Sequence, residues 1–148
     1  MDLTGKVAIL TGAAGGLGSA QVKLFVDAGC CVIATDLRES EARKSLLRYG
    51  DRAECMAHDV TKPDDWARVV DATLDRFGRL DVLVNNAGIA PNGRMLDVSY
   101  EDYARIIEIN QHSIFYGMKA VAPAMATCMN VGNRSTNDTC DVTHCECC

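Results

Sequence analysis

Continuous apolar runs alternate with amphipathic segments along most of the chain. The runs KVAILTG (6–12) and CCVIATD (30–36) are hydrophobic at nearly every internal position rather than at every second one. Continuous hydrophobicity is typical of strands that are buried on both faces of a parallel sheet. Two further runs, AECMAHD (53–59) and LDVLVNNAG (80–88), complete the set of predicted strands.

The segments between these runs have the character of helices. In most of them apolar residues recur at every third or fourth position, which places them on one face of a helix. Gly29, Gly50 and Gly78 follow three of the segments, as expected of helix ends. Ser99 opens the last one with a side chain of the type that caps helix N-termini. The pattern predicts helices over 17–28, 39–50, 63–77 and 99–125.

This order of elements predicts one α/β domain. Strands that alternate with helices form parallel sheets covered on both faces, so we expect a Rossmann-like, doubly wound sheet over residues 1–125. The pattern stops after the fourth strand and the long fourth helix, which predicts a truncated fold and an irregular, disordered tail over 126–148. In such a sheet the fourth strand forms an exposed edge, and we expect a marginally stable, aggregation-prone domain.

A glycine-rich loop, TGAAGGLG, follows the first predicted strand and enters the first helix. It contains Gly12, Gly16 and Gly18. Glycine permits a positive φ and lets backbone N–H groups approach a pyrophosphate, while the helix N-terminus supplies positive partial charge. Tight turns can be glycine-rich for steric reasons alone. The strand before the loop and the helix after it are what indicate a nucleotide-binding loop.

Asp36 stands at the end of the second predicted strand, the position from which a carboxylate binds an adenosine ribose. It would repel a 2′-phosphate, so NAD is favoured over NADP. Arg38 argues in the other direction because its side chain can reach a phosphate, whereas Ala14 and Gly15 add no basic group to the loop. The alternative for Asp36 is an acidic residue at a helix start.

These features resemble the short-chain dehydrogenase/reductase family. TGAAGGLG (11–18) fits the Thr-Gly-x-x-x-Gly-x-Gly loop of that family, and NNAG (85–88) fits its fourth-strand motif. HDVTKPDDW and INQHSIFYGMKAVAPAM continue the likeness over roughly residues 3–125. The resemblance implies a nicotinamide-dependent oxidoreductase that interconverts secondary alcohols and ketones, here represented by its cofactor-binding half.

The resemblance also assigns roles to residues. Asp59 and Val60 would border the adenine, and 86–88 would line the cofactor near its ribose. Asn110 matches the asparagine of the family's Asn-Ser-Tyr-Lys catalytic set, which helps to hold a water in a proton relay. The implied cofactor contacts are Gly12, Gly16, Leu17, Gly18, Asp36, Leu37, Asp59, Val60, Asn86, Ala87 and Gly88.

Asn110 also stands out by its position. Tyr103, Ile107, Ile114 and Met118 lie at helical spacing around it, which predicts one amide within a buried apolar stripe. A buried amide needs hydrogen-bond partners. A core asparagine with a purely structural bond and the catalytic asparagine are both compatible with this pattern, and the resemblance favours the second.

Tyr116 and Lys119 are not the catalytic tyrosine and lysine. On a regular helix they point roughly 120° and 180° away from Asn110. Their spacing is Tyr-x-x-Lys, whereas the family has Tyr-x-x-x-Lys on a later helix. We expect Tyr116 to be a packing residue and Lys119 a solvated one. Chemistry in the family needs a serine, a tyrosine and a lysine beyond Met125, and residues 126–148 contain no tyrosine or lysine.

The composition of the end of the chain differs from the rest. Of the eight cysteines, Cys30 and Cys31 fit a buried strand, but most of the others follow residue 127. A disordered end, a zinc site and an extracellular tail with the sequons NRS and NDT are the competing interpretations. We favour the first and expect no metal site. The zinc ligands would be Cys140, His144, Cys145 and Cys147.

The formal net charge of -5 and the pI near 5.1 give no broad attraction to nucleic acid or to anionic membranes. The N-terminal apolar run, Val7–Leu10, is too short for a signal peptide or a membrane span, so a cytoplasmic location is expected. The family resemblance implies a small alcohol or ketone as substrate and a homo-oligomer. Two functions remain: an NAD-dependent oxidoreductase, and an inactive nucleotide-binding fragment that lacks the serine, tyrosine and lysine.

Overall fold

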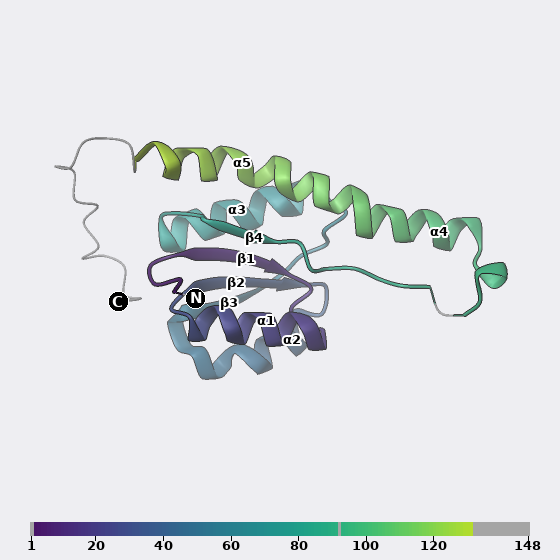
Figure 1. The fold of residues 1–148 in the computed structure, drawn as a ribbon, viewed down its shortest axis with the longest axis horizontal. Coiled ribbons are helices and arrows are strands. Elements are labelled where there is room, and N and C mark those ends of the chain that lie inside the picture. The colour runs from purple at the N-terminus through teal and green to yellow at the C-terminus, as the bar shows by residue number, and fades with distance from the viewer. Residues whose placement is uncertain (1, 92, 132–148) are drawn as a thin grey trace.

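The computed structural model describes residues 2–91 and 93–131. Its centre is a parallel sheet with the strand order β3-β2-β1-β4 (Figure 1). The strands are β1 (Val7–Thr11), β2 (Cys31–Asp36), β3 (Ala53–Ala57) and β4 (Val82–Val84). This sheet confirms the predicted doubly wound α/β architecture.

Helices cover both faces of the sheet. Figure 1 shows α1 (Gly16–Asp27) and α2 (Glu39–Leu46) below it and α3 (Pro63–Phe77) and α5 (Ser113–Val131) above it. Each layer has its own apolar core. Val22 and Val26 of α1 pack with Leu10 of β1 on one side. Trp66 and Val69 of α3 pack with the strands on the other.

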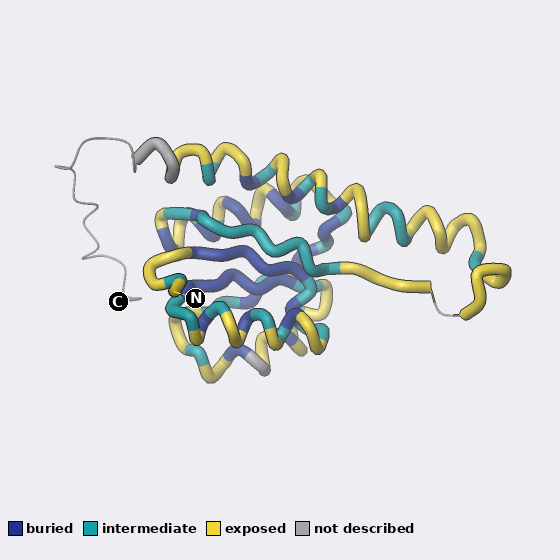
Figure 2. Tube along the Cα trace, viewed as in Figure 1, coloured by how far each residue is buried: buried dark blue, intermediate teal, exposed yellow. Residues whose placement is uncertain are grey.

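Burial follows the strand order. All of β1 and nearly all of β2 are buried, whereas β4 is only half-buried (Figure 2). β4 pairs only with β1 among the described strands, with Ile9 aligned to Leu83. It therefore forms the edge of the sheet over residues 2–91 and 93–131. Cys30 and Cys31 are buried, as predicted, and burial raises the pKa of Cys30 to about 11.

Several boundaries differ from the predicted ones. The helix predicted over 39–50 ends at Leu46 and continues as a 3₁₀ turn, Leu47–Arg52, in which Gly50 has φ 57°. β4 is shorter than the predicted strand over 80–88, because the chain after Val84 leaves the sheet. A short 3₁₀ helix at Met95–Asp97, which the pattern did not predict, precedes the long helix.

The long helix is interrupted by one π-helical turn. The Ser99 hydroxyl caps its start by accepting from the Asp102 N–H at 3.0 Å. The helix then runs as α4 (Tyr100–Ile107), a π turn (Glu108–His112) and α5. It continues to Val131, so residues 126–131 are helical rather than part of an irregular tail. The remaining tail and its predicted zinc ligands and sequons lie outside the described residues.

The predicted apolar stripe around Asn110 is not buried. Tyr103 is 54% exposed, Met118 is 52% exposed, and Asn110 is exposed as well. Tyr103 precedes the π turn, but for the residues after it the π turn adds a residue to one turn and changes the face that they present. The buried positions of α5 are instead Ser113, Gly117 and Val121.

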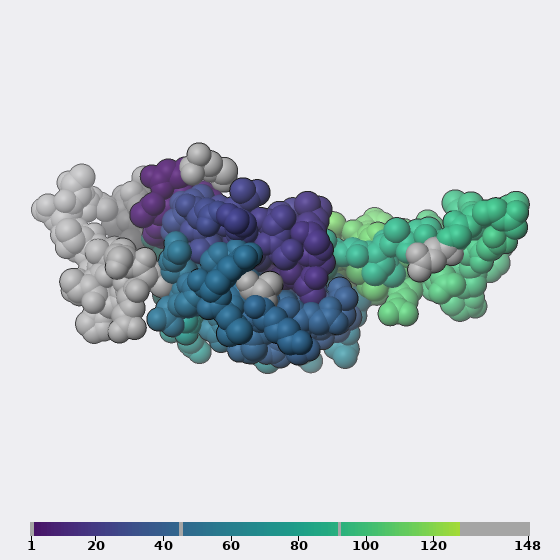
Figure 3. Space-filling model, turned by 90° about the horizontal axis from the view of Figure 1, so that it is seen from below, coloured from purple at the N-terminus to yellow at the C-terminus, as the bar shows by residue number. Residues whose placement is uncertain are grey.

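The long helix and the loop before it extend past the body of the domain. Figures 1 and 3 show α4 and the 3₁₀ turn before it projecting beyond the ends of the strands. Met95, Leu96 and Tyr100 on this projection are at least 80% exposed. Over the described part of the chain, no helix has both the length and the apolar character needed to cross a bilayer.

His58 is a buried histidine at the end of β3. It is 2% exposed, its Nδ1 lies 2.9 Å from the Thr35 hydroxyl, and its ring packs edge-on against Trp66. Its Nε2 is buried and has no hydrogen-bond partner among the described residues. Burial therefore lowers the pKa of His58 from 6.5 to about 4.

This environment predicts acid destabilisation with a defined sign. The unfolded chain takes up a proton on His58 below pH 6.5, while the folded chain resists protonation down to about pH 4. The free energy of unfolding should therefore fall as the pH drops through 6.5, by about 2 kcal/mol between pH 7 and pH 5. Urea denaturation at the two pH values measures it.

His58→Asn should remove most of that pH dependence, because no ionisable group is left at the site. His112→Asn is the matched control, since His112 is exposed beside Glu108. An unchanged pH slope in His58→Asn would show that another group causes the effect.

Candidate nucleotide-binding site

The carboxyl ends of three neighbouring strands meet at one edge of the sheet. The glycine loop leaves β1 after Thr11, Asp36 ends β2, and Asn86 follows β4. Because the strands are parallel and adjacent, these groups lie together although they are far apart in the sequence. A crevice at this edge is the usual ligand site of open α/β sheets.

The glycine loop folds back tightly upon itself. Gly12 has φ 73°, a conformation that favours glycine. A Cβ on Gly18 would lie 2.1 Å from the Gly12 carbonyl oxygen, so only glycine fits there. Gly16 is different, because a Cβ there would have no neighbour within 4 Å. The open space above Gly16 leaves room for a ligand to approach the backbone.

The N-terminus of α1 presents free backbone donors to this space. Gly15 caps the helix without a side-chain bond, and the first turn contains no acidic residue. The hydrogen-bonded ladder begins with the Ser19 N–H, which donates to the Gly15 carbonyl at 2.9 Å. The N–H groups of Gly16, Leu17 and Gly18 have no acceptor within residues 2–91 and 93–131. Such donors, together with the helix dipole, bind an anion such as a diphosphate.

Asp36 connects the glycine loop to the end of β2. Its carboxylate accepts from the Ala14 N–H and from the Arg38 N–H, both at 2.9 Å. The side chain is 10% exposed, so it is held in one place while one edge stays accessible. A fixed carboxylate beside the glycine loop is suited to accept hydrogen bonds from ribose hydroxyls.

Arg38 is held by acidic neighbours. Its Nη1 lies 3.0 Å from Glu41 Oε2, and its Nε lies 3.8 Å from Asp36 Oδ1. The guanidinium is therefore paired with two carboxylates instead of being free for a phosphate. The Arg38 side chain is 59% exposed, so these pairs lie at the surface of the domain.

Thr11 and Asn86 join the glycine loop to the segment after β4. The Thr11 hydroxyl accepts from the N–H of Asn86 at 3.1 Å and from the N–H of Ala87 at 3.0 Å. The Asn86 Nδ2 in turn donates a hydrogen bond of 2.8 Å to the Thr11 carbonyl. The structure thus brings together Gly12, Asn86 and Ala87, three of the predicted cofactor contacts. The bridging role of Thr11 was not predicted, since a threonine inside a strand looks like an ordinary core residue.

Asn110 meets the same segment further along. Its Oδ1 accepts from the Ile89 N–H at 2.9 Å, and its Nδ2 donates to the Ile89 carbonyl at 2.7 Å. A Cβ on Gly88 would lie 3.3 Å from Asn110 Oδ1, so glycine gives the side chain room. Asn110 is exposed, contrary to the predicted burial, but both ends of its amide are satisfied.

The other predicted cofactor contacts differ in how far their side chains are exposed. Asp59 accepts from Thr61; burial opposes ionisation, but these bonds and Lys62 lower the pKa of Asp59. The side chain of Val60 is buried in the core, so only its backbone is available to a ligand. Leu17, in the first turn of α1, and Leu37, directly after β2, are each 68% exposed.

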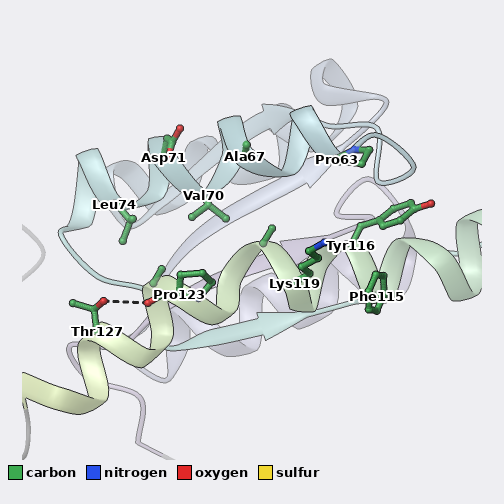
Figure 4. A pocket seen from close by; sticks show the side chains of 12 residues that line it. Pro63, Ala67, Val70, Asp71, Leu74, Phe115, Tyr116, Lys119, Pro123 and Thr127 are labelled. Carbon is green, nitrogen blue, oxygen red and sulfur yellow. Dashed lines mark hydrogen bonds between the residues drawn. The ribbon is translucent and has the colours of Figure 1, made fainter.

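Tyr116 and Lys119 lie in a separate groove between α3 and α5 (Figure 4). Tyr116 donates to Glu108 at 3.3 Å, and burial together with Glu108 raises the pKa of Tyr116. Lys119 is exposed, as predicted. The groove is lined by residues of α3 and α5 and by none of the glycine loop. The part of the chain that the structure describes contains no group of side chains arranged to hold a metal ion.

Comparison with known proteins gives a consistent result. The family described as short chain dehydrogenase matches residues 6–133. A 3-beta-hydroxysteroid dehydrogenase of Comamonas testosteroni is 40% identical over 83% of this chain and 48% of its own length. A 3-oxoacyl-(acyl-carrier-protein) reductase of Vibrio cholerae is 41% identical over 84% of this chain and 51% of its own length.

Solved structures agree with the sequence relatives. The 3-ketoacyl-(acyl-carrier-protein) reductase of Brucella melitensis, complexed with NADH, matches with a TM-score of 0.84 and 32% identity. The match covers 88% of this chain and 55% of that one. The chain thus spans about half the length of the relatives it matches.

The loop geometry predicts that alanine lowers the free energy of unfolding strongly at one glycine and hardly at all at another. Gly18→Ala should lower the free energy of unfolding by about 2 kcal/mol or more, because its Cβ meets backbone that cannot rotate away. Gly16→Ala, the matched control, should change it by less than about 0.5 kcal/mol in the absence of nucleotide. Urea denaturation compares the two, and equal stabilities would contradict the observed packing.

Proposed function

Because the chain belongs to the short-chain dehydrogenase family, we propose that it is the cofactor-binding part of an NAD-dependent oxidoreductase. The reaction is hydride transfer between nicotinamide and a secondary alcohol or ketone. The family consists of oxidoreductases that use a nicotinamide cofactor. The observation that carries the proposal is the glycine loop, where the N–H groups at the start of α1 have no acceptor among the described residues and the adjoining Ala14 N–H binds Asp36.

The residues present fit such a cofactor. The diphosphate would lie over the N–H groups of Gly16, Leu17 and Gly18, and the adenosine ribose beside Asp36. The space above Gly16, which a side chain would reduce, supports this position. The chain's own contribution is therefore to bind and to orient the dinucleotide.

Charge favours NAD over NADP. Asp36 would repel a 2′-phosphate, and Arg38 is already paired with Asp36 and Glu41. The NADH in the complex of the Brucella melitensis reductase supports the same cofactor. Exposed Leu37, directly after Asp36, offers apolar surface to the adenine.

Asn110 is the residue of this chain that we assign to the reacting end. When bound, the nicotinamide supplies or accepts the hydride. The Asn110 amide holds both the N–H and the carbonyl of Ile89, which fixes the backbone after Gly88 where the nicotinamide ribose would lie. Its Oδ1 keeps a second lone pair and its Nδ2 a second N–H, either of which can hold a water.

The substrate class follows from the relatives. Hydroxysteroids and 3-oxoacyl groups, named in the two curated relatives, form the same pair of functional groups, a secondary alcohol and a ketone. A substrate of that kind is our proposal for the whole protein.

One observation favours the alternative, an inactive nucleotide-binding chain. Within residues 2–91 and 93–131, Tyr116 and Lys119 are directed to the groove between α3 and α5 and not to Asn110. These two residues therefore do not supply the tyrosine and the lysine that proton transfer at the substrate needs.

Cofactor preference is the first test. By calorimetry, NADH should bind at least about tenfold more tightly than NADPH, equivalent to about 1.4 kcal/mol. Asp36→Asn and Glu41→Gln should each improve NADPH binding, the first by removing the repelling charge and the second by releasing Arg38. Glu101→Gln, on exposed α4, is the charge-matched control. Tighter binding of NADPH than of NADH by the unaltered chain would overturn the assignment.

Turnover separates the two functions. Loss of the nicotinamide absorbance of NADH at about 340 nm, measured with a panel of ketones, would support the oxidoreductase. NADH binding without turnover by this chain would support the inactive alternative. Absence of binding to well-folded protein would contradict both.

A further inference from the structure

Gly117 marks the closest approach of α5 to the rest of the domain. A Cβ at this position would lie 2.7 Å from Trp66 Cη2 and 2.9 Å from Asn85 Oδ1. Real Cβ atoms do not come so close to other atoms, so any side chain at 117 would displace a neighbour or the helix. Gly117 is buried and its φ is not positive, so its backbone conformation does not require glycine.

Glycine in a helix interior is unfavourable relative to alanine. The residue is therefore explained by the contact and not by the helix. At this position α5 lies directly against the Cη2 and Cζ2 atoms of the Trp66 ring and the end of the Asn85 side-chain amide.

Trp66 is not free to make room. It is 1% exposed, its Nε1 donates to the Val60 carbonyl at 2.9 Å, and its ring meets His58 edge-on with centroids 4.4 Å apart. A hydrogen bond, a ring contact and full burial hold it in one orientation. Displacement of α5 is consequently the easier response to a larger residue at 117.

The long helix contacts the segment after β4 from α5 and from the π turn. Gly117 lies against Asn85, and Asn110 binds the backbone of Ile89. Seven residues of helix span about 10 Å, and four residues of extended chain span about 13 Å, so the two intervals are similar in length. Gly117 and Asn110 thus fix one helix along one short stretch of backbone.

We propose that Gly117 is a positioning residue: its contact with Trp66 and Asn85 sets the distance of α5 from the sheet and thereby places Asn110 on Ile89. This role rests on the proposed function, because Asn110 and the segment 86–89 form the reacting end of the cofactor site. The contact also connects that end to the His58–Trp66 pair.

The test uses the full chain and two substitutions, one that adds side-chain volume at 117 and one that removes it at 66. Gly117→Ala adds a methyl group, and Trp66→Phe removes the ring atoms that it would meet. In ¹⁵N NMR spectra of the cofactor-free chain, the backbone amide signal of Ile89 and the side-chain NH₂ signals of Asn110 report the contact between these two residues. NADH dissociation constants from calorimetry report the function. Met118→Ala, at the exposed neighbouring position of α5, is the control.

Gly117→Ala is expected to shift the signals of Ile89 and Asn110 and to weaken NADH binding by about tenfold. Adding Trp66→Phe should return both toward the values of Trp66→Phe alone, a rescue that a general loss of stability would not give. Met118→Ala should change neither.

Unchanged Ile89 and Asn110 signals in a folded Gly117→Ala variant would overturn the proposal. So would a double variant without rescue. If Gly117→Ala does not fold, recovery of folding and of the two signals in the double variant supports the role, and failure of both variants to fold overturns it. Rescue of the signals in a chain that binds no NADH would support the contact and overturn the proposed function.

Discussion

The crevice depends on one contact of backbone with backbone, between the Gly12 carbonyl and Gly18. This contact turns the chain from β1 into α1 within a few residues and leaves the first N–H groups of the helix facing outward. Thr11 and Asn86 reinforce the turn from the opposite side by joining it to the segment after β4. Since the donors belong to the backbone, the anion site is defined by chain path more than by side-chain chemistry.

A similar arrangement recurs on the other side of β4. Gly88 leaves room for the Asn110 amide, and Gly117 leaves room for Trp66 and Asn85. At each place a missing side chain allows a larger or polar group to pack directly against the backbone. The two ends of the site are therefore built by the same means, and the half-buried strand β4 lies between them.

The strands, their order and the glycine loop were predictable because continuous hydrophobicity and glycine spacing are local signals in the sequence. Asp36 was singled out by its position at a strand end, and Asn86 by the family resemblance. The exposure of Asn110 was not predicted, because the π turn at Glu108–His112 has no clear signature in the sequence and alters the faces of the helix. Thr11 and Asn85 were missed as well, since their roles appear only when strands distant in sequence come together.

The π turn also constrains how the long helix can change in evolution. Deleting Gln111 would restore regular α geometry and shorten the helix between Asn110 and Gly117 by one residue, about 1.5 Å of rise. Asn110 and Gly117 would then no longer reach Ile89 and Trp66 together. Substitutions at the exposed positions of this helix are compatible with the fold, whereas insertions and deletions within it are not. Among related proteins the length of the helix should therefore be conserved more strictly than its sequence.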